Sequence, residues 1–282
     1  MSGDGNPEHR PSEAGEPVRR QQTDHWTVEL LPRRAYVAHY TPPGPVIGFS
    51  FDSQSGMHAF ASGRVTPFRT YPNGLAFVPA GCDVYSRSEE GGEYLSILGA
   101  PDTGNTAPFS DRTDPAAILL AHNLRRLLLG AADPDPLLLG ELAAALAERA
   151  LSLVPDAVAP DAVAPGIVTA RRLTPARLKR VCELIDDRLD EQLSVAMLAD
   201  AVGLSEASFS RAFRAATGVP PHAYLRDRRI AHARSLIVTT RRDLDEIALD
   251  CGFSSHAHMT AGFRQRLGIA PSALRRTDAF RV

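Results

Sequence analysis

The sequence predicts a two-domain α+β protein, with a β-rich N-terminal domain that ends in two helices and an all-α C-terminal domain. Its 282 residues are about twice the length of a common single domain. Short β-rich runs broken by turn residues fill the first hundred residues. After residue 110 the apolar residues are spaced for helices instead. We therefore expect two cores joined by a linker.

Residues 24–110 are expected to form a small antiparallel sandwich or barrel. Turn formers such as Pro42-Pro43-Gly44 and Pro72-Asn73-Gly74 separate the apolar runs. The runs are WTVELL, AYVAHY, VIGFSF, LAFVPA, DVYS and EYLSIL. Residues 1–23 are polar, and we expect them to be a disordered arm.

Two amphipathic helices are expected over residues 111–154, where AAILLAHNLRRLLLG and PLLLGELAAALAERALSLV follow. An Asp-Pro pair begins each helix and Gly130 closes the first. Because both helices are rich in leucine, they either cover the open side of the barrel or form a seam for a partner. Residues 155–172 contain PDAVAPDAVAPG and are expected to be a Pro/Ala linker.

Charge is distributed unevenly along the chain. Residues 171–282 carry 19 Arg or Lys and 13 Asp or Glu, whereas residues 1–170 carry 12 and 20. A basic C-terminal half suits a polyanionic partner, although a plain solvated surface would also explain the excess.

Cysteine usage and hydropathy favour a cytoplasmic protein without a membrane partner. Cys82, Cys182 and Cys251 are odd in number and have no CxxC spacing, which argues against a disulfide framework and a structural zinc site. No apolar run approaches the roughly 18 residues that span a bilayer, and the N-terminus lacks the apolar segment of a signal peptide.

The most informative feature is a duplication within residues 173–282. SVAMLADAVGLSEASFSRAFRAATGVPPHAYLR and LDEIALDCGFSSHAHMTAGFRQRLGIAPSALR align along most of their length. Each copy predicts a helix, a glycine turn and a second helix, with turns at Gly203-Leu204-Ser205 and Gly252-Phe253-Ser254. The glycine closes the first helix in the left-handed conformation and the serine caps the second. The sequence thus predicts two helix-turn-helix units, joined by a long helix from Pro221 to about Val238.

Helical spacing separates buried from exposed side chains in each second helix. Phe209 and Phe213 are expected to face inward, and Met259 and Phe263 form the matching core pair. The opposite faces and their flanks carry the candidate DNA-binding residues, which are Glu206, Ala207, Ser210, Arg211, Arg214, Ser255, His256, His258, Thr260 and Arg264.

Residues from about 173 to 277 resemble the DNA-binding domain of the AraC/XylS family. The resemblance is carried by LADAVGLS, SRAFRAATGVPPHAYLRDRRIAHARSLI, IALDCGFSS and FRQRLGIAPSALR. The upstream half resembles the family's cupin-like effector and dimerisation domain more loosely, through NGLAFVPAGCDV and the two helices after it.

The resemblance implies a cupin-like β-barrel followed by a double helix-turn-helix domain. It also implies a sequence-specific transcription factor that sets two recognition helices into successive major-groove segments of operator DNA. A small-molecule effector, contact with RNA polymerase and a role as activator follow from the same resemblance. The leucine-rich helices, and the weak affinity expected of one such DNA-binding domain, predict a homodimer through the N-terminal half.

The linking helix carries Arg226, Arg228, Arg229 and Arg234, which have two interpretations. They contact backbone phosphates, or they keep the helix soluble and form ion pairs within the domain with Asp227. The sequence leaves both open.

Three alternatives remain: a DNA-binding protein without ligand response, a cupin-type enzyme fused to a DNA-binding module, and a repair protein with an activated cysteine. His25, His39, His58 and His122 are dispersed and lack a His-x-His pair. His256 and His258 are two residues apart on a helix, so they point in different directions and suit contact with DNA better than chelation. We expect no enzyme activity, no metal and no cofactor, and we expect all three cysteines to be small core residues.

Overall fold

The structure is a computed structural model that describes residues 16–61, 63–102, 104, 107–130, 133–154 and 173–279. The chain divides into two compact units, Met1–Ala159 and Pro160–Val282. The predicted Pro/Ala linker over residues 155–172 lies outside the described residues, as do residues 1–15 of the predicted arm. Within the described part of the chain, no helix is long and apolar enough to cross a membrane.

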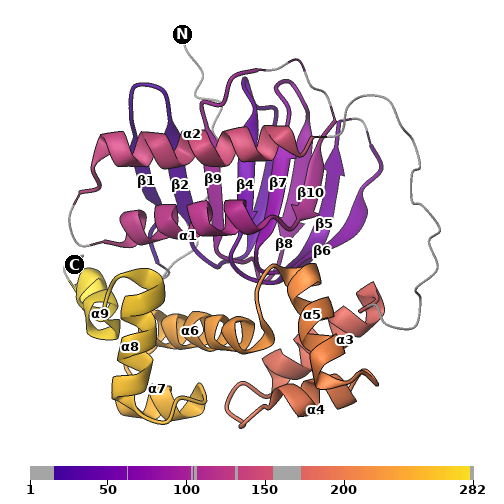
Figure 1. The fold of residues 1–282 in the computed structure, drawn as a ribbon. Helices are drawn as coiled ribbons and strands as arrows, with labels where there is room; N and C mark the ends of the chain where they lie inside the picture. The colour runs from indigo at the N-terminus through magenta and orange to yellow at the C-terminus, as the bar shows by residue number, and fades with distance from the viewer. Residues whose placement is uncertain are drawn as a thin grey trace. The chain divides into compact units, whose positions relative to one another are not determined.

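The N-terminal unit contains two antiparallel sheets (Figure 1). The six-stranded sheet has the order β1 (Arg19–Gln22), β2 (Thr27–Leu31), β9 (Tyr94–Leu98), β4 (Val46–Ser50), β7 (Gly74–Val78) and β10 (Phe109–Arg112). The four-stranded sheet has the order β3 (Tyr36–Tyr40), β8 (Val84–Ser88), β5 (Gln54–Phe60) and β6 (Thr66–Thr70).

A closed cupin-like barrel is not confirmed. Among the described residues, no strand of the six-stranded sheet is paired with a strand of the four-stranded sheet. The alternative of a sandwich, which the turn spacing also predicted, describes the arrangement. All six predicted strand runs are confirmed, as β2, β3, β4, β7, β8 and β9.

The prediction that residues 1–23 form a disordered arm is wrong for its last part. Arg19–Gln22 form β1, which pairs with β2 in the register Arg19↔Leu30 to Gln22↔Thr27. The sequence RRQQ has no apolar alternation, and an edge strand needs none because its backbone pairs with a neighbour while its side chains remain exposed or half-buried. The N-terminal unit also extends past residue 110, because β10 continues to Arg112.

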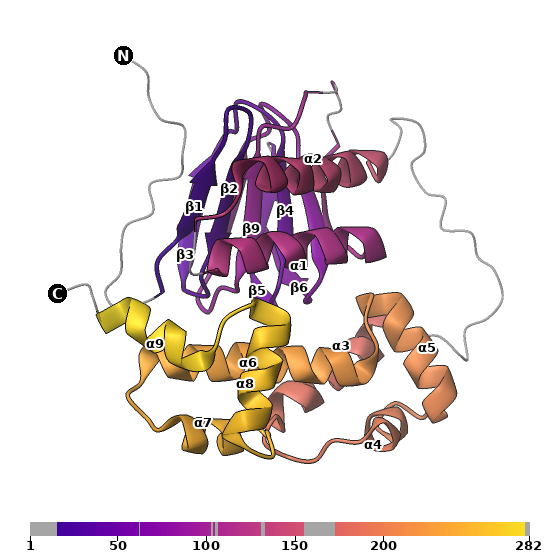
Figure 2. The same ribbon diagram turned by 60° about the vertical axis from the view of Figure 1, so that its left-hand side comes forward.

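Helices α1 (Pro115–Leu129) and α2 (Pro136–Ser152) lie across one face of the six-stranded sheet (Figures 1 and 2). Their predicted starts are confirmed: Asp114 and Asp135 accept backbone N–H bonds from Ala117 and Leu137, and each helix begins with proline. Gly130 caps the end of α1, as predicted.

Alternation along the strands explains why these helices pack on that face. Six strand residues point toward the helices and are at most 1% exposed: Ile47, Phe49, Leu75, Phe77, Leu95 and Ile97. Phe49 contacts His122 of α1, with ring centroids 6.2 Å apart. Buried Arg125 of α1 forms an ion pair with Glu93 and lies 4.6 Å above the ring of Phe51. Covering the sheet therefore accounts for the buried leucines of both helices.

The C-terminal unit is all-helical in the part that the structure describes. Its helices are α3 (Pro175–Asp187), α4 (Val195–Asp200), α5 (Glu206–Thr217), α6 (Pro221–Thr239), α7 (Leu244–Asp250), α8 (His256–Leu267) and α9 (Pro271–Ala279). Helix α6 matches the predicted linking helix to within one residue at its end.

Candidate nucleic-acid interface

The first helix pair is α4 and α5, joined by a tight turn. Gly203 has φ +65°, and the backbone N–H of Leu204 donates to the carbonyl of Ala199 at 3.0 Å, which closes α4. Ser205 then caps α5, because its hydroxyl accepts the N–H of Ser208 at 3.4 Å. The predicted roles of the glycine and the serine are confirmed here.

The second pair, α7 and α8, has the same turn. Gly252 has φ +75°, and the N–H of Phe253 donates to the carbonyl of Ala248 at 2.9 Å. The predicted cap, Ser254, is wrong: Ser255 is the N-cap and accepts the N–H of His258 at 3.1 Å. The extra residue of the second copy lies in this turn, which moves the capping position on by one.

The predicted core pairs hold both second helices in place. Phe209, Phe213, Met259 and Phe263 are each 0% exposed. The rings of Phe209 and Phe213 are 5.4 Å apart, and Phe213 packs edge-on against Tyr224 of α6 at 5.2 Å. With these side chains buried, the opposite faces of α5 and α8 point to solvent.

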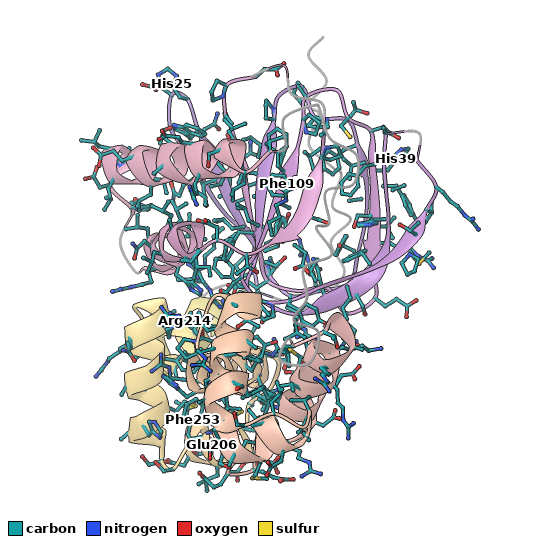
Figure 3. All side chains as sticks on the ribbon, turned by 45° about the vertical axis from the view of Figure 1, so that its right-hand side comes forward. His25, His39, Phe109, Glu206, Arg214 and Phe253 are labelled. Carbon is teal, nitrogen blue, oxygen red and sulfur yellow. The ribbon has the colours of Figure 1, made fainter. Side chains whose placement is uncertain are left out.

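The predicted site residues lie on or beside those outward faces. Glu206 and Arg214 stand at the two ends of the exposed face of α5 (Figure 3). Seven of the predicted residues are exposed, namely Glu206, Ala207, Arg211, Arg214, Ser255, His258 and Arg264. Ser210, His256 and Thr260 are half-buried at the flanks. Five of the predicted residues therefore lie together on α5. The other five lie together on α8 and its N-cap, Ser255.

The two faces differ at one position of the aligned copies. Arg211 of α5 is exposed, and the equivalent residue of α8 is Ala261. Gln265, also exposed, was missed by the sequence analysis. Helical spacing could have identified Gln265, because it lies one turn after Ala261 and two turns after His258 on the same face of α8. A glutamine amide can bond an adenine edge with two hydrogen bonds.

The two histidines of α8 have different partners, as their helical spacing predicts. His258 Nδ1 lies 3.0 Å from Ser254 Oγ, and its ring packs edge-on against Phe253 at 5.5 Å. His256 Nδ1 lies 3.9 Å from Asp245 Oδ1 on α7. The turn before α8 therefore orients His258, and α7 orients His256.

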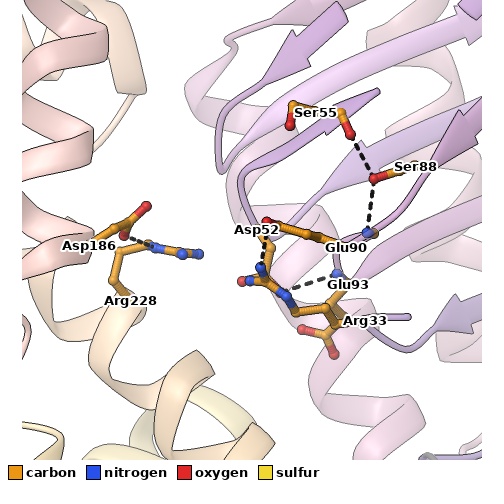
Figure 4. Close-up of polar contacts among 9 residues, drawn as sticks. Arg33, Asp52, Ser55, Ser88, Glu90, Glu93, Asp186 and Arg228 are labelled. Carbon is orange, nitrogen blue, oxygen red and sulfur yellow. Dashed lines mark hydrogen bonds and ion pairs between the residues drawn. The ribbon is translucent and has the colours of Figure 1, made fainter. Parts of the chain in front are cut away.

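The arginines of α6 are engaged inside the unit. Arg228, 7% exposed, donates from Nε to Asp186 Oδ1 of α3 at 2.7 Å (Figure 4). Arg229 donates to the carbonyls of Leu189 and Glu191 at 2.9 and 2.7 Å, and Arg234 is buried. Of the two interpretations left open by the sequence, internal bonding describes Arg228 and Arg229. The Nε of Arg226 has no hydrogen-bond partner within the described residues, so both interpretations stay open for Arg226.

Asp227, the acidic partner considered for those arginines, pairs elsewhere. Its Oδ1 accepts from Arg266 Nε at 2.7 Å. This bond joins α6 to the end of α8, so it fixes α8 against the linking helix.

The cysteines are core residues, as predicted. Cys82, Cys182 and Cys251 are buried and unbonded to one another in the described chain. Burial raises the pKa of the Cys251 thiol to about 12. A thiol with that pKa stays protonated at neutral pH and is a poor nucleophile.

These two helix pairs define a domain of the helix-turn-helix class, and comparison with known proteins agrees. Residues 198–277 match the family model described as a helix-turn-helix domain. The chain is 32% identical over 88 residues to the probable transcriptional regulator LumQ of Photobacterium leiognathi, covering 31% of this chain and 36% of LumQ. It is 31% identical over 102 residues to the transcriptional activator RhaS of Escherichia fergusonii, covering 36% and 37% of the two chains. The matches lie within the C-terminal unit and agree with the resemblance of that unit to the DNA-binding domain of the AraC/XylS family.

Among solved structures, the chain is similar to the DNA-binding domain of the transcriptional factor AdpA in complex with a target DNA. The identity is 35%, the match covers 37% of this chain and 96% of that chain, and the TM-score is 0.36. The chain spans just over a third of the length of the curated relatives that it matches.

Proposed function

We propose that this chain is a sequence-specific transcription factor that binds double-stranded operator DNA. The observation that carries the proposal is the repeated turn geometry at Gly203 and Gly252, which presents two similar helices with polar, solvent-facing sides. The relatives named above are transcription regulators, which favours regulation over an enzymatic role.

In the proposed binding mode, both helix pairs are helix-turn-helix units. Helices α5 and α8 enter successive major-groove segments, because that groove is wide enough for an α-helix. Arg211 reads guanine, whereas Arg214 and Arg264, near the ends of their helices, contact phosphates. The other predicted contacts are Glu206, Ala207, Ser210, Ser255, His256, His258 and Thr260.

The N-terminal unit is proposed to be a cupin-like effector domain. Its support is a cavity of about 270 Å³ lined by both sheets of the sandwich. The proposed boundaries are an effector domain to residue 110 extended by β10, a helical segment over 111–154, a linker over 155–172 and a DNA-binding domain over 173–282.

Two protein partners complete the proposal. A homodimer through α1 and α2 is supported by three exposed leucines, Leu119, Leu137 and Leu138, which are 69%, 71% and 41% exposed. RNA polymerase is proposed as the second partner, because the chain resembles regulators that activate transcription.

Genomic footprinting of the purified protein tests the proposal. We expect protected sites that share one motif with two half-sites about one helical turn apart. Uniform protection without a shared motif would contradict sequence-specific binding. Loss of all binding upon deletion of the C-terminal unit is the matching control.

A further inference from the structure

The interior of the sandwich is open because one face of the six-stranded sheet carries small residues. The same alternation that buries Ile47 and Phe49 against the helices turns Gly48 and Ser50 toward the four-stranded sheet. The inward positions of β4, β7 and β9 include Gly48, Ser50, Gly74, Ala76 and Ser96. Facing positions of this size cannot fill the space between two sheets, which leaves the cavity.

Aromatic side chains line much of the remaining wall. Tyr36 and Tyr40 come from β3, and Tyr94 comes from β9. Tyr94 lies close against β4, where a Cβ at Gly48 would come within 1.6 Å of its hydroxyl. On the opposite sheet, the ring of His58 stacks on Phe68 at 4.9 Å. These walls favour apolar and aromatic surfaces in a ligand.

Two polar atoms in this wall have no hydrogen-bond partner within the described residues. They are Oε1 of Gln54, a residue only 9% exposed, and Oγ1 of Thr70. Gln54 and Thr70 are direct register partners on β5 and β6, so both side chains point from the same face of the sheet, and both line the cavity. Buried polar groups in proteins are almost always satisfied, so this pair calls for a group that donates to the amide oxygen and bonds the hydroxyl.

The titratable groups of the cavity wall include two carboxyls, Glu29 and Asp111, against one guanidinium, Arg34, so the wall does not favour an added anion. Glu29 lies 3.6 Å from Arg20, and Asp111 Oδ1 accepts the backbone N–H of Tyr71 at 3.2 Å. Burial raises the pKa of both carboxyls and lowers the pKa of Arg34 and of His58. Desolvation thus opposes the charged form of each of these four side chains.

We propose that the cavity binds a neutral, largely apolar molecule bearing one hydroxyl group, an inference that rests on the effector role proposed above. The ligand hydroxyl donates to Gln54 Oε1 and accepts from Thr70 Oγ1. Its apolar body lies among the tyrosine and phenylalanine rings. Sugars, which carry many hydroxyls, and carboxylates, which carry a charge, do not match this wall.

Calorimetric titration of the full chain with three matched probes tests the ligand class. The probes are 2-naphthol, its ether 2-methoxynaphthalene and the anion 2-naphthoate, with glucose as a polyol control. We expect 2-naphthol to bind about tenfold more tightly than the ether, because the ether cannot donate to Gln54. We expect no detectable heat from 2-naphthoate or glucose. Tighter binding of 2-naphthoate, or no binding of 2-naphthol, would overturn the proposal.

Variants of the register pair test the named residues. Gln54→Leu and Thr70→Val should each reduce the preference for 2-naphthol over the ether. Thr66→Val makes the same change on the same strand at an exposed residue outside the cavity wall, and should leave the preference intact. An unchanged preference in Gln54→Leu would mean that a bound water, and no ligand hydroxyl, occupies the pair.

A measurement without ligand keeps the test decisive. Replacing a buried amide whose oxygen has no partner within the described residues by leucine should raise the melting temperature of the free protein. A lower melting temperature would show that Gln54 is already satisfied and would contradict the inference.

The same preparations are tested for DNA binding by gel shift. DNA binding without probe binding overturns only the ligand class, whereas loss of DNA binding in the unmodified chain overturns the proposed function.

Discussion

Arg211 carries the guanidinium on α5 that has no equivalent on α8, where Ala261 stands at the matching position. Arginine can bond guanine O6 and N7 together, which discriminates between bases by about 1–3 kcal/mol. We expect Arg211→Ala to relax the preference at one or two base pairs of the half-site read by α5. Site selection with the variant measures this, and an unchanged motif would refute the role of Arg211.

Arg264 provides the contrasting case on α8. It is exposed in the last turn, and the phosphate contact proposed for it would position the helix without reading sequence. Arg264→Ala should weaken binding evenly across sequences and reduce the slope of log K against log[salt] by about 0.9. A change of motif in this variant would assign Arg264 to base reading instead. Gln265 makes the difference between α5 and α8 smaller, because its side chain could form two hydrogen bonds to an adenine base.

Arg228 illustrates a basic residue that is buried and bonded inside the domain. Its buried guanidinium is bonded to Asp186 of α3 at 2.7 Å. Arg228→Leu leaves that carboxylate without its partner, so we expect the free energy of unfolding to fall by about 2 kcal/mol. Chemical denaturation measures this change. The slope of DNA affinity against salt, measured well below the unfolding temperature, should not change, and a shallower slope would indicate a phosphate contact.

At the scale of the element, the two glycine turns have the same backbone but different surroundings. A Cβ at Gly203 would meet open space within the described structure, whereas a Cβ at Gly252 would lie 2.2 Å from the carbonyl oxygen of Leu189. That oxygen also accepts a hydrogen bond from Arg229. The turn of the second pair is therefore packed against the segment after α3, and the turn of the first pair is free.

This difference yields a matched pair of variants. Gly203→Ala should lower the free energy of unfolding by about 1 kcal/mol, since alanine is strained only by the left-handed conformation. Gly252→Ala should lower it by roughly 3 kcal/mol, because the new Cβ also clashes with the backbone. Thermal unfolding of both variants measures the difference. Equal costs would mean that the turn at Gly252 is not held against Leu189.

Helices and strands with strong local sequence signals could be predicted, whereas strands that depend on pairing with neighbouring strands could not. Asp114 and Asp135 before proline identified α1 and α2, and the repeated glycines identified the helix pairs. Strands β5 and β6 were missed because Gly56 and Pro67 interrupt their alternation, although pairing with β8 and with each other stabilises them. Ser255, and not the predicted Ser254, caps α8 because the turn of the second copy is one residue longer than that of the first.

At the scale of the whole molecule, the cavity is a property that no single segment encodes. It depends on small residues of three strands facing Gln54 and Thr70 from the other sheet, and the register of ten strands decides which residues those are. The proposed DNA-binding face, in contrast, lies on continuous helices. Helical spacing alone was therefore enough to propose its residues from the sequence.

The proposed dimer can be tested through the leucines that the sheet leaves uncovered. Leu119 of α1 and Leu137 of α2 are 69% and 71% exposed, and charge there would oppose burial in an interface. Leu119→Glu combined with Leu137→Glu should convert the full chain to monomer in sedimentation at micromolar concentration. Val37→Glu, at a 67% exposed residue of β3, is the matched control and should remain dimeric.

Loss of the dimer should also weaken DNA binding. Two linked copies engage two sites at a high effective concentration, so the monomeric variant should bind a paired operator roughly 100-fold more weakly than the native chain. Binding to an isolated half-site should be unchanged, because one DNA-binding domain suffices for it. If the double variant stays dimeric, α1 and α2 are not the interface. If it becomes monomeric and binds the paired operator as before, each copy acts alone on DNA, and the dimer has no part in recognition.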